Sequence, residues 1–205
     1  MKRMAINRCS RSLAIVVFAL GAFSAHAAVS PVSVSIVRPI QFPSEEVMVA
    51  GARASLLWGS HRRVYGVDIG VLGNMTSVRS GGVAISGLFN FNRGETSVLG
   101  LQLAGLTNIN VGGTTVLGVQ AAAGTNSNRG EATLVGLQIA GLANFSDHTK
   151  IWGAQVGVFN SAREVRGFQI GLVNVTDKLY GLQIGLVNIH KQGLFRVCPV
   201  INFGF

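Results

Sequence analysis

The chain has 205 residues, of which 48% are hydrophobic and only 12% charged, with 27 glycines and a formal net charge of +9. At this length the chain can form one domain with a sizeable core or one membrane barrel. The composition excludes a disulfide-built domain. Cys9 and Cys198 are the only cysteines, and Cys9 lies in a predicted leader segment.

The first 27 residues are predicted to be a cleaved secretory signal peptide. Four basic residues flank the start of an apolar run over 13–23, and Ala25-His26-Ala27 is the small-x-small site that a signal peptidase accepts. The apolar run is too short for a membrane-spanning helix, which needs about 20 residues. Its removal lowers the net charge from +9 to +5. We therefore expect an exported chain over 28–205 that forms one repeat-built β domain, with no nucleic-acid partner.

A unit of the form GxQxGxxN recurs through most of the mature chain. Gly181-Leu182-Gln183-Ile184-Gly185-Leu186-Val187-Asn188 is its clearest copy. Further copies cover 66–74, 82–90, 100–108, 118–126, 136–144, 153–160 and 167–174. Two of them depart from the pattern, because Ala84 replaces the Gln and 121–125 lack large apolar residues. Such self-similarity is the signature of a repeat architecture.

Alternation within the unit predicts a β-strand. Large apolar side chains occupy every second position from Tyr180 to Leu186, and the positions between them hold Gly or Gln. A strand of this kind has one apolar face and one face of small or polar residues. The closing Asn is a turn residue, and successive closing Asn residues lie only 14 to 18 positions apart. The predicted fold class is therefore all-β.

The first interpretation is an antiparallel up-and-down β-barrel of about 10–12 strands in the bacterial outer membrane. Such strands need about 9–11 tilted residues, with an apolar outer face and a polar lumen face. The turns alternate in kind, because Asn-Arg-Gly-Glu over 92–95 recurs over 128–131, two units later. Alternate apolar residues up to Phe205 resemble the last strand of outer-membrane barrels. The expected partners are outer-membrane lipid and, through this strand, the barrel assembly machinery.

In a barrel the Gln position of each unit would face the lumen. The lumen-facing candidates are Arg53, Asp68, Gln102, Gln120, Gln138, Gln155, Gln169 and Gln183. Arg53 and Asp68 hold matched positions on neighbouring strands, so we predict a salt bridge between them; the alternative is that each charge is solvated in the lumen.

The second interpretation is a β-solenoid with rungs of 14–18 residues. Gln and Asn at fixed positions in successive units suit ladders of stacked side chains, and the Leu/Ile face would then form the core. Tyr65, Trp152 and Tyr180 would also make only a thin aromatic belt for a membrane barrel.

The units, the opening Gly66-Val67-Asp68-Ile69-Gly70 and the ending Cys198-Pro199-Val200-Ile201-Asn202-Phe203 look like bacterial surface-repeat proteins, which are exported chains built from GxQxGxxN units. The resemblance covers roughly 39–205 and implies an outer-membrane or surface location, the periplasm being an alternative. It supplies no binding residues. We expect a structural or narrow-pore role for a barrel, and a binding or adhesion role for a solenoid, with an unidentified ligand.

The sequence predicts no catalytic, metal or cofactor site. His61, His148 and His190 lie outside HExxH spacing and beside no plausible nucleophile. The glycines lie within strands and precede no helix, so they match no phosphate-binding loop. Asp147 and Asp177 are isolated loop acids, which are usually solvated. We therefore expect a protein without enzymatic activity.

Overall fold

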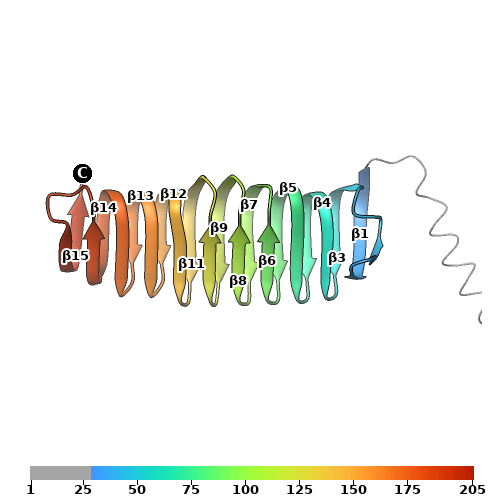
Figure 1. The fold of residues 1–205 in the computed structure, drawn as a ribbon, viewed down its shortest axis with the longest axis horizontal. Helices are drawn as coiled ribbons and strands as arrows, with labels where there is room; N and C mark the ends of the chain where they lie inside the picture. The colour runs from blue at the N-terminus through green and yellow to red at the C-terminus, as the bar shows by residue number, and fades with distance from the viewer. Residues whose placement is uncertain (1–28) are drawn as a thin grey trace, which may run out of the picture.

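The computed structural model describes residues 29–205 as a β-solenoid of about 10 turns, a rod in which successive rungs stack along the long axis (Figure 1). The predicted signal peptide lies outside these residues. No helix in the described part of the chain is long and apolar enough to cross a membrane.

The strands join into one continuous sheet that winds along the rod. They are β1 Val29–Val37, β2 Ile40–Phe42, β3 Met48–Ser55, β4 Trp58–Gly70, β5 Gly73–Ser86, β6 Phe89–Asn92, β7 Glu95–Ala104, β8 Thr107–Asn110, β9 Thr114–Ala122, β10 Thr125–Asn128, β11 Ala132–Ala140, β12 Ala143–Val156, β13 Phe159–Ile170, β14 Val173–His190 and β15 Val197–Gly204. Neighbouring rungs pair in parallel, and antiparallel partners occur at the two ends, where β2 pairs with β1 and β15 pairs with β14.

The predicted antiparallel barrel of about 10–12 strands is therefore wrong, and the solenoid alternative is confirmed. In the parallel ladders Gly136 lies beside Gly118 on one side and Gly153 on the other, and each Gln lies beside the Gln of the next unit. This stacking is favoured because equivalent residues meet, so that identical amide side chains bond to one another. Antiparallel pairing of the same strands would bring unlike positions together.

Amide ladders fill the interior of the rod. Each Gln from Gln120 to Gln183 donates from Nε2 to the Oε1 of the preceding Gln over 2.7–2.9 Å. Each closing Asn from Asn74 to Asn174 donates from Nδ2 to the Oδ1 of the following Asn over 2.8–3.1 Å. The two ladders run in opposite directions, so their side-chain dipoles oppose each other. Because these amides are fully buried, such pairing avoids the penalty of unsatisfied polar groups.

The expected Leu/Ile core is also wrong. Those side chains lie on the outside, where Leu182 and Ile184 are exposed, while the apolar core is a narrow column of residues that lie two positions before the first Gly of each unit. The column holds Val98, Val116, Leu134, Ile151, Val165 and Leu179, with Ala162 beside them. The reason is that the Gln face and the Leu/Ile face alternate, so burying the amide ladders turns the large apolar face outward.

Two buried histidines lie at the ends of a second interior column, formed by the residues two positions after the closing Asn of each unit. His61 lies beside Thr76 at the start of the column, and His190 lies two positions after Asn188 at its end. Burial, and then the charge of Arg53, lower the pKa of His61 from 6.5 to about 4. Burial also lowers the pKa of His190, whose Nε2 accepts a hydrogen bond from the Leu179 backbone over 3.1 Å. The imidazole of His61 is therefore neutral at pH 7 in the folded protein.

We expect this protein to lose stability on acidification. The unfolded chain protonates His61 near pH 6.5, whereas the folded chain does so only near pH 4. The stabilisation is therefore complete above pH 6.5 and falls as the pH drops from 6.5 to 4, by about 3 kcal/mol. Urea unfolding at several pH values measures this loss of stability. His61→Gln should reduce the dependence of the unfolding free energy on pH, whereas His148→Gln, at an exposed position, should leave that dependence unchanged.

Candidate functional site on the charged edge

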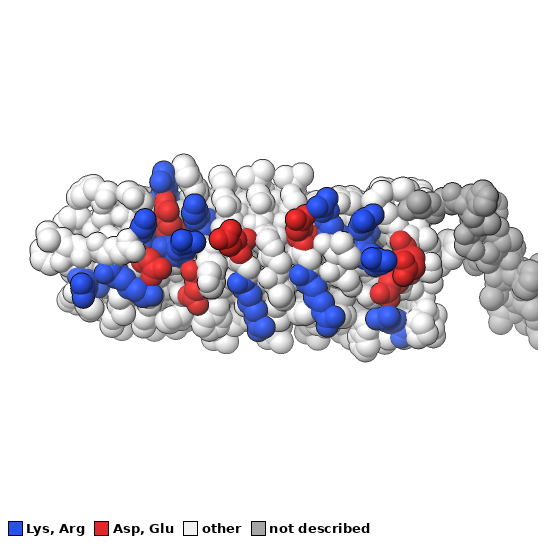
Figure 2. Space-filling model, turned by 45° about the horizontal axis from the view of Figure 1, so that its top comes forward, with Lys and Arg blue, Asp and Glu red and all other residues white. Residues whose placement is uncertain are grey.

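Each rung bends at two opposite edges of the rod. The turns inside the GxQxGxxN units form what we call the apolar edge, which is the lower edge in Figure 1, from which β6 and β8 rise. The connections from each closing Asn to the next Gly form what we call the charged edge. Within the units themselves, from 51 to 189, the only Lys, Arg, Asp or Glu residues are Arg53 and Asp68. Figure 2 shows the charged side chains gathered in a band along the rod.

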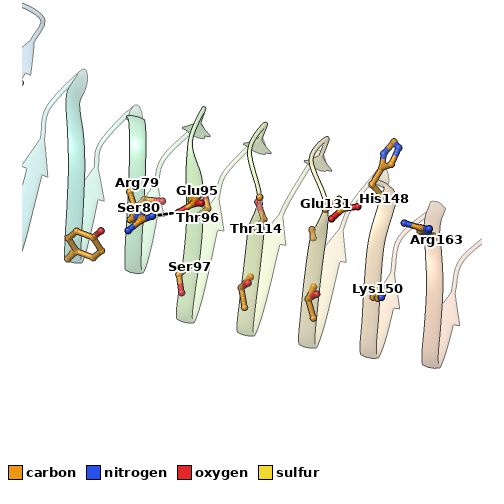
Figure 3. A pocket seen from close by; sticks show the side chains of 15 residues that line it. Arg79, Ser80, Glu95, Thr96, Ser97, Thr114, Glu131, His148, Lys150 and Arg163 are labelled. Carbon is orange, nitrogen blue, oxygen red and sulfur yellow. Dashed lines mark hydrogen bonds and ion pairs between the residues drawn. The ribbon is translucent and has the colours of Figure 1, made fainter.

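A groove with a volume of about 670 Å³ runs across the charged edge over several rungs. It lies where the connections are longest, since ten positions separate Asn108 from Gly118 but only seven separate Asn160 from Gly167. Its lining is Tyr65, Arg79, Ser80, Glu95, Thr96, Ser97, Gly113, Thr114, Thr115, Glu131, Ala132, Thr133, His148, Lys150 and Arg163 (Figure 3). The groove is thus centred on the longer connections and reaches Arg163 in the shorter one.

A row of hydroxyl groups forms part of the groove. Ser97, Thr115 and Thr133 are direct neighbours on three successive rungs, and Lys150 continues the row on the fourth. Ser97, Thr115 and Lys150 are exposed and Thr133 is half-buried. Because parallel strands are about 4.8 Å apart, the row presents a polar group at that spacing along the rod. Such an array matches a ligand that is itself extended and repetitive.

Opposite charges lie at different places along the groove. Arg79 forms an ion pair with Glu95 on the neighbouring rung, as the dashed line in Figure 3 marks. Within the described residues, Glu131, Lys150 and Arg163 take part in no ion pair. The lining therefore offers two cationic side chains, Lys150 and Arg163, to acid groups of a ligand, and one carboxylate, Glu131, to its hydroxyl groups.

The Gln-position residues predicted to face a lumen lie elsewhere. Arg53, Asp68 and the six Gln residues are buried inside the solenoid, and none of them lines the groove. The predicted salt bridge is confirmed, because Arg53 Nε donates to Asp68 Oδ1 over 2.7 Å and Nη2 donates to Oδ2. Arg53 Nη1 also donates to the Met75 carbonyl over 2.9 Å. Arg53 and Asp68 occupy, in the first rungs, the position that Gln occupies in later rungs.

The groove residues were not predicted as a site. Their signal was the Asn-Arg-Gly-Glu segment over 92–95 and 128–131, together with the wider Asn spacing. In an antiparallel barrel these segments would lie on the same rim but on separate strand pairs. Parallel stacking instead aligns Ser97 with Thr115 and Thr133, and this alignment creates the row.

The described residues contain no group of three or more His, Cys, Asp or Glu side chains that could hold a metal ion. The two loop acids have other partners, because Asp147 accepts a hydrogen bond from Ser161 Oγ and Asp177 pairs with Lys191 over 2.9 Å.

No family model, curated protein or solved structure matches this chain. The resemblance to bacterial surface-repeat proteins stays a prediction that rests on the GxQxGxxN units.

Proposed function

We propose that the protein is an exported, surface-located β-solenoid that acts as a binding module, and that its groove on the charged edge holds an extended polyhydroxylated chain such as an oligosaccharide. The observation that carries this proposal is the row formed by Ser97, Thr115, Thr133 and Lys150 on successive rungs. In this function the protein binds its ligand without transforming it.

The strand backbone favours a glycan over a peptide. Peptides often bind by adding a strand to a free sheet edge, where N–H and C=O groups are unpaired. In the groove, Thr115 lies on β9, which has β7 on one side and β11 on the other. Ligand recognition there depends on side chains, and hydroxyl, ammonium and carboxylate groups suit the hydroxyls and acid groups of a polysaccharide. Lys150 and Arg163 would bind the acid groups.

Binding of the mature chain to an array of neutral and acidic polysaccharides tests this function. Lys150→Ala should weaken binding to an acidic polysaccharide about tenfold or more, because it removes a charge-assisted hydrogen bond. Lys178→Ala is the matched control, since Lys178 occupies the same position two rungs further on and lies outside the groove. Equal losses in both variants, or no binding by the parent protein, would refute the proposal.

A further inference from the structure

The rod carries an extended apolar surface opposite the groove, to which 121–125 in the middle of the rod contribute only small side chains. We call it the apolar band and define it as the outward-facing side chains of 51–60, 66–75, 82–91, 100–109, 118–127, 136–145, 153–161, 167–175 and 181–189. Its prominent turn residues Leu106, Leu142 and Leu186 are 56%, 62% and 66% exposed. The two charged residues of these segments, Arg53 and Asp68, are buried and paired. An exposed apolar surface of this extent indicates an interaction site.

The apolar band is convex and wraps around the edge. Leu182 and Ile184 lie on one side of the turn, Leu186 lies on the turn itself, and Val187 and Ile189 follow it. A rigid protein partner, including a second copy of this rod, would need a matching trough to cover both sides. Fluid hydrocarbon needs no such trough, because it surrounds a convex edge wherever that edge enters.

The backbone of the apolar edge is already hydrogen-bonded, as burial in lipid requires. At the turns, Leu172 N donates to Val158 O over 2.9 Å, and Val187 N donates to Leu172 O over 2.9 Å. Asn174 Nδ2 further donates to the Ile184 carbonyl over 2.9 Å. Each rung thus forms hydrogen bonds with the backbone groups in the turn of its neighbour. These groups therefore stay paired when the apolar edge moves from water into lipid.

Amphipathic aromatic residues lie where the apolar band meets the charged edge. Tyr65, Trp152 and Tyr180 each precede the first Gly of a unit, and Trp152 and Tyr180 are 47% and 43% exposed. Arg166 lies between these two rings, with its Cζ 4.4 Å from the Trp152 centroid and 5.0 Å from that of Tyr180. Trp, Tyr and Arg are the side chains that settle at the headgroup level of a bilayer.

We propose that the apolar band is a lipid-docking surface, with the rod lying flat on a bilayer, the turns inserted at the boundary between headgroups and acyl chains, and Trp152, Arg166 and Tyr180 at the headgroups. This orientation leaves the charged edge and its groove in water. Docking does not depend on the groove's ligand, so either proposal can fail without the other.

Flotation of the mature chain with neutral phosphatidylcholine vesicles at high salt tests the docking. The expected result is co-flotation with a blue shift of tryptophan fluorescence, because Trp58 and Trp152 are both exposed on or beside the apolar band. Leu142→Glu with Leu186→Glu should reduce the bound fraction about tenfold or more, since charged groups are costly in the acyl region.

The matched control is Val78→Glu with Val111→Glu, which adds the same two charges to exposed valines on the charged edge. It should float like the parent protein, and circular dichroism should show all three proteins folded. Equal loss in both double variants, binding only to anionic vesicles at low salt, or a stable dimer that ignores vesicles would each overturn the proposal.

Discussion

Asp68→Gln is expected to destabilise the first rungs of the solenoid by about 3–5 kcal/mol, because it leaves the Arg53 guanidinium buried without a counterion. The Arg53 side chain is 0% exposed, so water cannot replace the lost carboxylate. Of the present hydrogen bonds of this guanidinium, only the one to the Met75 carbonyl does not involve Asp68. Urea unfolding measures the loss of stability, and amide hydrogen exchange of β3 and β4 shows whether it is located in these strands. A local measurement is needed because repeat proteins unfold in sections.

The double variant Arg53→Gln with Asp68→Gln separates a charge effect from a general defect. It places at both positions the residue that later rungs carry, and Arg53 and Asp68 are direct neighbours across β3 and β4. Replacing a buried ion pair by a satisfied neutral pair is often neutral. We therefore expect recovery to within about 1 kcal/mol of the parent protein. A double variant as unstable as the single one would show that the amide ladder cannot extend to these rungs.

Gly136→Ala should disrupt the middle of the rod at a cost of about 3 kcal/mol or more, because two penalties combine. Gly136 has a φ of 129°, a conformation that side chains with a Cβ rarely adopt. An added Cβ would also lie 2.1 Å from the Gly118 carbonyl oxygen of the preceding rung. Thermal unfolding and hydrogen exchange on β9 and β11 measure the loss.

Gly113→Ala is the control for this effect. An added Cβ there meets nothing closer than the Glu131 carbonyl oxygen at 3.9 Å, and its φ is not positive. Alanine at such a position reduces the freedom of the unfolded chain and should stabilise by about 0.4–1 kcal/mol. Similar losses at both glycines would refute the explanation based on rung stacking.

The sequence by itself determined the strands and the relation between their faces. Alternation from Tyr180 to Leu186 placed Gln183 on the face opposite Leu182 and Ile184, because successive side chains of a strand point to opposite sides. The Arg53–Asp68 pair followed from their matched positions alone. It would form in a barrel or a solenoid, since both bring adjacent units side by side. The spacing of 14 to 18 positions between closing Asn residues fits both folds and did not distinguish them.

Only the tertiary structure decided which strands become neighbours and in which direction. A barrel with a polar lumen and a solenoid with a polar interior need the same alternation of side chains. The side chain of Gln155 is therefore predicted to point inward in either fold. The difference lies in its partners, which are Gln138 and Gln169 from adjacent rungs. Hydrogen bonds between residues this far apart in sequence leave no local pattern. For the same reason the groove, which depends on the parallel alignment of Ser97 with Thr115, became apparent only in the fold.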